Sequence, residues 1–398
     1  MKKKLSKGIS KSSSPLGKLD GAAGIYIHIP FCKQACHYCD FHFSTSLKKK
    51  DELIEALAKE LELRKDEFKD VTVETIYFGG GTPSLLTNDE LQLLMDSVYK
   101  NYQVSENPEI TLEANPDDLS AQRIEDLANS PINRLSIGIQ SFFESDLKLM
   151  NRAHNEEEAK KCLSVATRYF DNISLDLIYG IPGASNEQWQ RNIEIALSYN
   201  VPHISSYALT VEPKTALASF INKGIIEDVD DEQAHEQFHI LKDRLEEEGF
   251  IHYELSNFGK EGYFSKNNSA YWQGKPYIGV GPSAHSFNGT QRGWNVRNNS
   301  KYIKAIQHNE LPIEIETLTK TDQYNEYIMT GLRTIWGVSL TKVEQDFGMV
   351  YKDYLIEQAN VFINQHLLYI DDEHLRVTEK GQFLSDGIAS ELFKLNLS

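Results

Sequence analysis

Residues 26–41 read Tyr-Ile-His-Ile-Pro-Phe-Cys-Lys-Gln-Ala-Cys-His-Tyr-Cys-Asp-Phe and contain three of the four cysteines of the 398-residue chain, Cys32, Cys36 and Cys39. The preceding run, Gly24–Ile29, is typical of a β-strand, so the cysteines are expected on the loop that follows this strand. Thiolates are soft ligands that select zinc, copper(I) or iron–sulfur clusters. Three thiolates on one loop suit a cubane cluster that leaves one iron without a protein ligand, and an open metal position is a place for chemistry.

The same cysteine loop leaves a zinc site open as the alternative. Structural zinc sites use four ligands, often in two separated pairs, and His28, His37 or His42 could complete such a set. The common four-cysteine ferredoxin run has a different spacing and a fourth thiolate. Four cysteines, three of them clustered, do not form the disulfide framework of a secreted protein, and we therefore expect a reducing, cytoplasmic location.

Around this loop, β-rich runs alternate with helical patterns. The runs expected to form strands are Gly24–Ile29, Glu74–Phe78, Glu109–Ala114, Arg134–Ile139, Asn172–Tyr179 and His203–Leu209. The helical patterns between them are Asp51–Phe68, Asn88–Tyr99, Ser120–Ala128, Glu156–Tyr169 and Glu187–Tyr199. Six βα units in succession predict parallel strands with helices outside, an α/β fold. Because a closed barrel needs eight units, we expect an incomplete (β/α)6 TIM-like barrel, with an open doubly wound sheet as the competing architecture.

The pattern changes after about residue 310. Helices are expected over Asp322–Ile335, Thr341–Phe347 and Lys352–Gln365, a hairpin over Leu368–Ile370 and Leu375–Thr378, and a closing helix over Glu379–Phe393. Helices followed by a hairpin suggest a small winged-helix-like domain. The hairpin tip carries Asp371, Asp372 and Glu373, and acids at that place favour a packing or partner role over DNA binding.

Composition sets the wider limits. The 41 Lys and Arg residues against 58 Asp and Glu residues give a net charge of −17, which argues against nucleic acid as the main partner. No apolar stretch is long enough for a membrane helix. The expected organisation is a basic disordered tail over residues 1–20, a barrel and its extension over 21–310, and a helical domain over 311–398.

Polar residues gather where the expected strands end. Gly79-Gly-Gly-Thr-Pro83 follows the second strand, Glu113 and Gln140 end the third and fourth, and Asp176 lies on the fifth. Function in parallel barrels gathers at the carboxyl ends of the strands, where these residues are expected. A second glycine-rich segment, Gly279–Ala284, fits a dinucleotide fingerprint by letter, but it contains Pro and precedes no helix.

These features together carry a family resemblance. The C-x3-C-x2-C spacing, with Tyr38 before the last cysteine, resembles the radical S-adenosylmethionine (radical SAM) superfamily. The resemblance implies that Cys32, Cys36 and Cys39 hold a [4Fe-4S] cluster whose fourth iron is chelated by S-adenosyl-L-methionine. One electron from such a cluster can cleave the sulfonium to an adenosyl radical. Over about residues 24–390 the chain resembles the coproporphyrinogen III oxidase-like group of this superfamily.

The resemblance also implies a set of cofactor-binding positions. Those that would line the adenosylmethionine pocket are Tyr26, Gly80, Gly81, Thr82, Glu113, Gln140, Arg152 and Asp176. Three further positions match a second adenosylmethionine of the decarboxylating branch: Tyr38, Ala208 and His285.

Within that group, two features resemble the HemW branch of haem chaperones. The decarboxylating branch has a further cysteine two residues after the third, where this chain has Phe41. Residues 266–272, Lys-Asn-Asn-Ser-Ala-Tyr-Trp, resemble an H-N-x-x-Y-W haem-binding motif, which implies haem contacts by Asn267, Asn268, Tyr271 and Trp272. The motif histidine is Asn267 here, and an amide is a poor ligand for haem iron. Tyr271, His252 and His285 are the other candidate ligands.

The resemblance therefore predicts a cytoplasmic haem chaperone that binds haem and passes it to an acceptor haemoprotein, with an electron donor such as a flavodoxin or ferredoxin. The alternative is an oxygen-independent coproporphyrinogen III oxidase, which decarboxylates a porphyrinogen oxidatively. A zinc-stabilised binding protein without redox chemistry is the third possibility. Neither nucleic acid nor stable membrane insertion is expected.

Overall fold

The computed structural model describes residues 21–395, so the disordered basic tail predicted for residues 1–20 lies outside the described residues. The strands of the main sheet are β1 (Gly21–Ile29), β2 (Val71–Gly80), β3 (Gln103–Ala114), β4 (Arg134–Gln140), β5 (Ile173–Tyr179), β6 (His203–Ala208), β7 (Ile251–Glu254), β8 (Asn257–Gly259), β9 (Tyr277–Val280), β10 (His285–Phe287), β11 (Gln291–Asn295) and β12 (Ile313–Thr317). The helices of the same part are α1 (Lys50–Leu63), α2 (Asn88–Asn101), α3 (Ala121–Ala128), α4 (Glu144–Leu149), α5 (Glu156–Ala166), α6 (Asn186–Leu197), α7 (Ala216–Asn222), α8 (Asp231–Glu247), α9 (Lys266–Trp272) and α10 (Asn299–Gln307).

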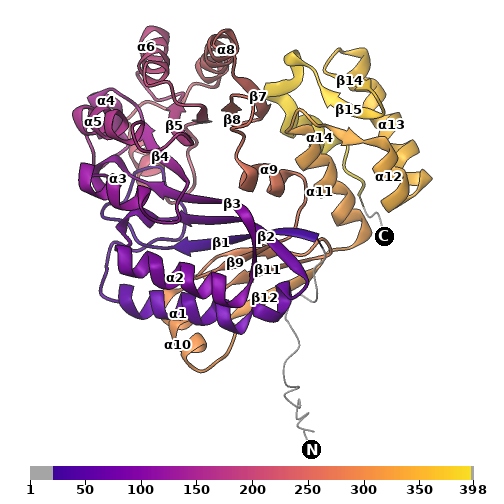
Figure 1. Cartoon of the computed structure of the whole chain (residues 1–398). Coiled ribbons are helices and arrows are strands. Elements are labelled where there is room, and N and C mark those ends of the chain that lie inside the picture. The colour runs from indigo at the N-terminus through magenta and orange to yellow at the C-terminus, as the bar shows by residue number, and fades with distance from the viewer. Residues whose placement is uncertain (1–20, 396–398) are drawn as a thin grey trace, which may run out of the picture.

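Strands β1 to β6 lie side by side in chain order and are all parallel, which confirms the incomplete barrel. A doubly wound sheet would reverse the strand order at a switch point, and the order here runs from β1 to β6 without reversal. The curved sheet carries helices such as α1 to α6 on its outer side (Figure 1). The carboxyl ends of these six strands therefore meet at one edge, where the cysteine loop begins.

The helices of this layer form for reasons that are visible in the sequence. Helix α1 buries Leu53, Ile54, Leu57 and Leu61 along one face against the sheet. Helices α2 and α5 each begin with a capping box, in which the side chain of the N-cap residue and that of a glutamate three residues later satisfy free backbone amides. The helix predicted to reach Phe68 ends at Leu63 and continues as a 3-10 turn over Lys65–Phe68.

Six further strands extend the sheet at both edges, and the sequence alone did not reveal them. Strand β9 pairs in parallel with β1 and is followed by antiparallel β10, β11 and β12, while β8 and β7 continue antiparallel beyond β6. Each has three to five residues, too few for a clear alternation of apolar and polar side chains. Strand β12 still belongs to this sheet, so the change to the C-terminal helices comes after Thr317.

A fully buried charge network fastens this extension to α1. The Arg64 guanidinium donates to both carboxylate oxygens of Glu67 at 3.0 and 2.9 Å and to Glu60 Oε1 at 3.3 Å, with all three side chains inaccessible to solvent. Arg64 also donates to the Gly279 carbonyl of β9 at 2.8 Å. Glu60 in turn accepts from the Asn295 side chain at 2.8 Å. Helix α1 and strands β9 and β11 are therefore joined through one set of buried charges.

The C-terminal part has its own core and the order of a winged helix. It comprises α11 (Lys320–Leu332), β13 (Val338–Ser339), α12 (Leu340–Phe347), α13 (Met349–Asn364), β14 (Leu368–Asp371), β15 (His374–Val377) and α14 (Ser385–Glu391), with β15 between β13 and β14 in a separate sheet. The predicted hairpin is present, and its tip residues Asp372 and Glu373 adopt positive φ.

The predicted closing helix over Glu379–Phe393 is wrong in its first half. Residues Glu379–Leu384 form a 3-10 helix, and α14 begins only at Ser385. A Cβ at Gly381 would lie 2.4 Å from the Leu367 carbonyl oxygen, so the first turn packs tightly against the turn before β14.

Helix α9 is set apart from the outer helices. It lies on the concave side of the sheet, between the strands and the C-terminal domain (Figure 1). Its first backbone amides, those of Lys266 and Asn267, both donate to the Glu109 carboxylate of β3 at 3.1 Å. None of the helices within residues 21–395 combines the length and hydropathy that a bilayer crossing requires.

Candidate functional site

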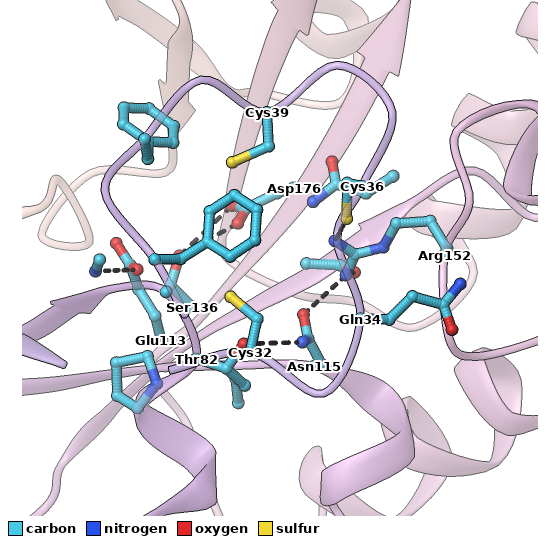
Figure 2. Close-up of a pocket in the computed structure, with 18 of the residues that line it drawn as sticks. Cys32, Gln34, Cys36, Cys39, Thr82, Glu113, Asn115, Ser136, Arg152 and Asp176 are labelled. Carbon is cyan, nitrogen blue, oxygen red and sulfur yellow. Dashed lines mark hydrogen bonds between the residues drawn. The ribbon is translucent and has the colours of Figure 1, made fainter. Parts of the chain in front are cut away.

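The cysteine loop is closed at its base by backbone hydrogen bonds. The Cys32 amide donates to the Ser44 carbonyl at 3.1 Å, and the Ser44 amide donates back to the Pro30 carbonyl at 2.8 Å. The Cys39 amide donates to the Cys36 carbonyl at 3.3 Å, which forms a tight turn between the last two cysteines. All three are free thiols, and Figure 2 shows their sulfur atoms facing one shared space at the carboxyl ends of the strands.

Burial keeps two of these thiols, Cys32 and Cys39, neutral in the absence of a metal. Burial raises the pKa of Cys39 to about 11 and also raises the pKa of Cys32. Metal binding would therefore release protons from the loop. Within residues 21–395 no three His, Cys, Asp or Glu side chains are grouped to hold a single metal ion.

The histidines that could have completed a zinc site have other roles. His28 Nε2–H donates to the His42 carbonyl at 3.1 Å, so its Nδ1 accepts from the Tyr26 hydroxyl at 3.1 Å. Burial lowers the pKa of His28 to about 4, which keeps the ring neutral. His37 Nδ1 lies 2.8 Å from the Leu149 carbonyl, and His42 Nε2 lies 2.7 Å from Asn299 Oδ1. These rings fasten the cysteine loop to its surroundings.

A cavity opens in front of the thiols, with about 760 Å³ between its walls when the part open to solvent is included. Most of the predicted cofactor-binding residues line it: Cys32, Cys36, Tyr38, Cys39, Gly80, Gly81, Thr82, Glu113, Gln140, Arg152 and Asp176. They come from the cysteine loop, from the ends of β2, β3 and β4, from β5 and from the segment after α4. Its lining combines apolar groups with several polar side chains that converge on one space, as in a pocket for a small-molecule cofactor.

Arg152 lies at the edge of the cysteine loop and connects it to the strand ends. Its guanidinium contacts Cys36 Sγ at 3.5 Å and donates to Asn115 Oδ1 at 2.7 Å and to the Gly138 carbonyl at 2.9 Å. Its Nε is buried and has no hydrogen-bond partner among the residues that the structure describes. A cation beside three thiolates offsets their charge, and the unpaired Nε–H leaves a donor for a bound group.

Two partly buried carboxyl groups line the cavity. Glu113 accepts from the Tyr77 hydroxyl at 2.8 Å and from the Gly80 amide at 3.1 Å, and Asp176 accepts from the Ser136 hydroxyl at 3.3 Å. Burial raises the pKa of Glu113 to about 7 and that of Asp176 to about 6. At neutral pH the Glu113 carboxyl is thus close to half ionised and the Asp176 carboxyl mostly ionised, and a cationic ligand would favour the charged form of each.

Glycine is required at several positions of this site because neighbouring atoms lie where a Cβ would be. Gly80 has φ of +111°, and a Cβ there would lie 2.4 Å from the His28 ring. A Cβ at Gly81 would lie 2.7 Å from the Phe31 carbonyl oxygen. At Gly138 it would meet the side chains of Gln140 and Arg152 at 2.8 and 3.3 Å. Side chains at these places would displace the groups that line the cavity.

Three predicted cofactor positions lie outside this cavity. Tyr26 is half-buried behind the Gly79–Gly81 turn, where its hydroxyl bonds to His28. Ala208 ends β6 and packs against the main core, and His285 is exposed on β10, a strand of the extension. The four candidate haem residues, Asn267, Asn268, Tyr271 and Trp272, all lie on α9.

The cavity has other lining residues that sequence reasoning missed: Gln34, Phe41, Phe43, Pro83, Ala114, Asn115, Ser136 and Gly138. Asn115 follows Glu113 by two residues, so its position at a strand end was a usable signal. Ser136 faces the interior from the middle of β4, and only the register of the strands brings it to Asp176.

Comparison with known proteins gives a consistent result. A profile of the radical SAM superfamily matches residues 26–196, and one of the HemN C-terminal domain matches residues 318–384. A protein of Lactococcus lactis described as heme chaperone HemW is 34% identical over 365 residues, 91% of this chain and 95% of that protein. The proteins of the same description from Bacillus subtilis and Escherichia coli are 34% and 32% identical, with 91% and 93% of this chain and 97% of each relative covered.

Among solved structures, the radical SAM enzyme coproporphyrinogen III oxidase (HemN) from Escherichia coli superposes with a TM-score of 0.81. The match covers 95% of this chain and 91% of that chain at 22% sequence identity. At this level of identity the superposition establishes a shared fold, including the C-terminal domain.

Proposed function

Because this chain belongs to the HemW branch of the radical SAM superfamily, we propose that it is a haem chaperone that binds haem and passes it to an acceptor haemoprotein. The observation that carries the proposal is the similarity to proteins of that description over nearly their whole length. The chain also has Phe41 at the position of the further cysteine of the decarboxylating branch.

The residues of the cavity fit the cofactors of the superfamily. Three free thiols face one space, beside an unpaired buried donor and beside Gly138, where a Cβ would press on the lining side chains of Gln140 and Arg152. When bound, the [4Fe-4S] cluster supplies single electrons next to S-adenosyl-L-methionine. Cys32, Cys36 and Cys39 would hold the cluster, and Glu113, Gln140, Arg152 and Asp176 would hold adenosylmethionine.

In this assignment the protein supplies position and charge. Glu113 and Asp176 would provide negative charge for the sulfonium and accept from the amino group of adenosylmethionine, while Arg152 offsets the thiolates and keeps a donor free. We further propose a flavodoxin or ferredoxin as electron donor. A cytoplasmic location is part of the proposal, since the four described cysteines are free thiols.

The experiment that tests the function is an anaerobic titration of the intact protein with haem, with and without its reconstituted cluster. We expect stoichiometric retention of haem, followed by transfer to an apo-haemoprotein that is added later. In parallel, the loaded protein receives adenosylmethionine, a reductant and coproporphyrinogen III. Loss of propionate carboxyl groups with turnover would establish the decarboxylase alternative and contradict the chaperone proposal.

Adenosylmethionine affinity is expected to rise with pH between about 6 and 8. The Glu113 and Asp176 carboxyl groups have pKa values of about 7 and 6, so each gains the negative charge that attracts the ligand only as the pH rises through its value. For Glu113 alone the gain is about tenfold over this range. Isothermal titration calorimetry of the cluster-loaded protein at several pH values measures this affinity. Glu113→Gln should remove the step near pH 7, and an unchanged profile would contradict the assignment.

A further inference from the structure

A second cavity lies between the sheet extension and the C-terminal domain. It has about 870 Å³ between its walls, including the part open to solvent, and is lined by residues from α9, β9, β10, β11, α11 and α12. On one side of it the Tyr271 ring of α9 lies 5.8 Å from the Tyr277 ring, and the Tyr277 ring lies 6.5 Å from the Phe287 ring, measured between centroids. Tyr327 and Phe347 of the C-terminal domain also line it, with centroids 6.4 Å apart. The cavity thus has aromatic groups from both domains.

Two cations also line this cavity. Arg292 on β11 forms an ion pair with Glu326 at 2.6 Å, and Lys342 on α12 forms one with Asp346 at 2.5 Å. The Arg292 and Lys342 side chains are 43% and 52% exposed, so both pairs are screened by water and are weak. An incoming carboxylate can therefore compete for either cation.

We propose that this cavity is the porphyrin site, in which the macrocycle lies against the aromatic groups and its two propionates pair with Arg292 and Lys342. The inference rests on the proposed haem chaperone function and assigns its ligand to a place in the fold. The ligand class is a planar tetrapyrrole with carboxylate side chains. Aromatic rings contact such a plane favourably, and guanidinium and ammonium groups are the usual partners of carboxylates.

Recognition at this site depends on the ring and its propionates and is independent of iron. The described residues that line the cavity include no histidine and no cysteine. Its carboxylates, Glu326 and Asp346, are paired with Arg292 and Lys342, and its phenols are those of Tyr271, Tyr277 and Tyr327. Phenolate ligation requires loss of the phenol proton. Burial raises the pKa values of Tyr277 and Tyr327, which disfavours that loss.

Asn267 fits this interpretation. It precedes Tyr271 by one helical turn on the same face of α9, and its side-chain oxygen accepts from the Thr75 hydroxyl at 3.2 Å. The residue that would be a histidine in the haem-binding motif is therefore engaged in a structural hydrogen bond to β2.

The test compares haem with iron-free protoporphyrin IX as ligands of the intact, cluster-loaded protein, using absorbance and fluorescence titrations. We expect the two affinities to agree within about threefold, and the double variant Arg292→Gln/Lys342→Gln to bind both about tenfold more weakly. Glu326→Gln frees Arg292 and should strengthen binding of both ligands. The control is Arg191→Gln, which removes an exposed cation on α6 that pairs with Glu194 at 2.9 Å.

The outcomes separate the inference from the function on which it rests. If the parent protein binds no porphyrin, the proposed function is wrong and the site falls with it. If the parent binds porphyrin but the Arg292, Lys342 and Glu326 variants behave like the Arg191 control, the function stands and the site is wrong. Binding of haem without binding of the iron-free ring would overturn the iron-independent recognition.

Discussion

Replacing Cys32, Cys36 or Cys39 singly by serine is expected to reduce iron and inorganic sulfide after anaerobic reconstitution to a small fraction of the parent value. A cluster held by three protein thiolates loses a third of its protein ligands with each change, and serine is a poor ligand for iron in this setting. The fold should survive, since all three side chains are partly accessible on a loop outside the apolar core. Iron and sulfide analysis, with the absorbance near 400 nm characteristic of such clusters, measures the loss.

The fourth cysteine provides a matched control. Cys162 lies on α5 and is buried in the main core, far from the loop in sequence and outside the cavity. Cys162→Ser places a hydroxyl in an apolar environment, so it should lower stability while leaving the iron content unchanged. Retention of a full cluster by two or more of the loop variants would contradict the assignment of these thiols as its ligands.

Arg64→Met is expected to lower the free energy of unfolding by about 3–5 kcal/mol, the cost of removing one partner from a buried ion pair. The change leaves the Glu60 and Glu67 carboxylates buried without their cation and removes the hydrogen bond to the Gly279 carbonyl. Because that bond joins the helix to β9, we also expect the extension to loosen first. Urea unfolding measures the stability, and hydrogen exchange of β9 to β11 measures the loosening.

Lys59→Met on the same helix is the control. Lys59 forms an ion pair with Glu62 at 3.5 Å, but both side chains are 40% or more exposed. Such pairs contribute about 0–1 kcal/mol, so this variant should unfold close to the parent. A loss of less than about 1 kcal/mol for Arg64→Met would show that water enters the network and that the two glutamates are not held in a dry environment.

The six-strand barrel could be predicted because each of its strands is long enough for its pattern of apolar residues to be recognised in the sequence. Runs such as Arg134–Ile139 and Asn172–Tyr179 are six to eight residues long and carry an apolar residue at every second position, the period that indicates a strand. The extension could not be predicted in the same way. Strands β8 and β10 have three residues each, and their pairing depends on tertiary contacts such as the Arg64 network.

The residues of the candidate site also fall into two groups, those that local sequence patterns predict and those that only the tertiary structure places. Glu113 and Gln140 lie at the ends of predicted strands, and their meeting in one cavity followed from the topology. Arg152 follows a short helix that the sequence did not reveal, so only the family resemblance indicated it. The resemblance assigned His285 to a second adenosylmethionine, and the structure places this residue exposed on an antiparallel strand of the extension. Its position is decided by how the chain returns to β1, which no local pattern encodes.

The central position of β1 in the sheet means that this strand stays without one of its neighbours for much of the synthesis of the chain. This strand lies between β2 and β9, and its second neighbour begins roughly 250 residues after it ends. At about 5–20 residues per second, a ribosome needs on the order of 12–50 s to make the intervening chain. Throughout that interval one side of the strand has unpaired amides and carbonyls, and the cysteines beside it have already emerged. The nascent chain therefore exposes free thiols next to an unpaired strand edge, which can pair with other chains, before β9 has been synthesised to cover it.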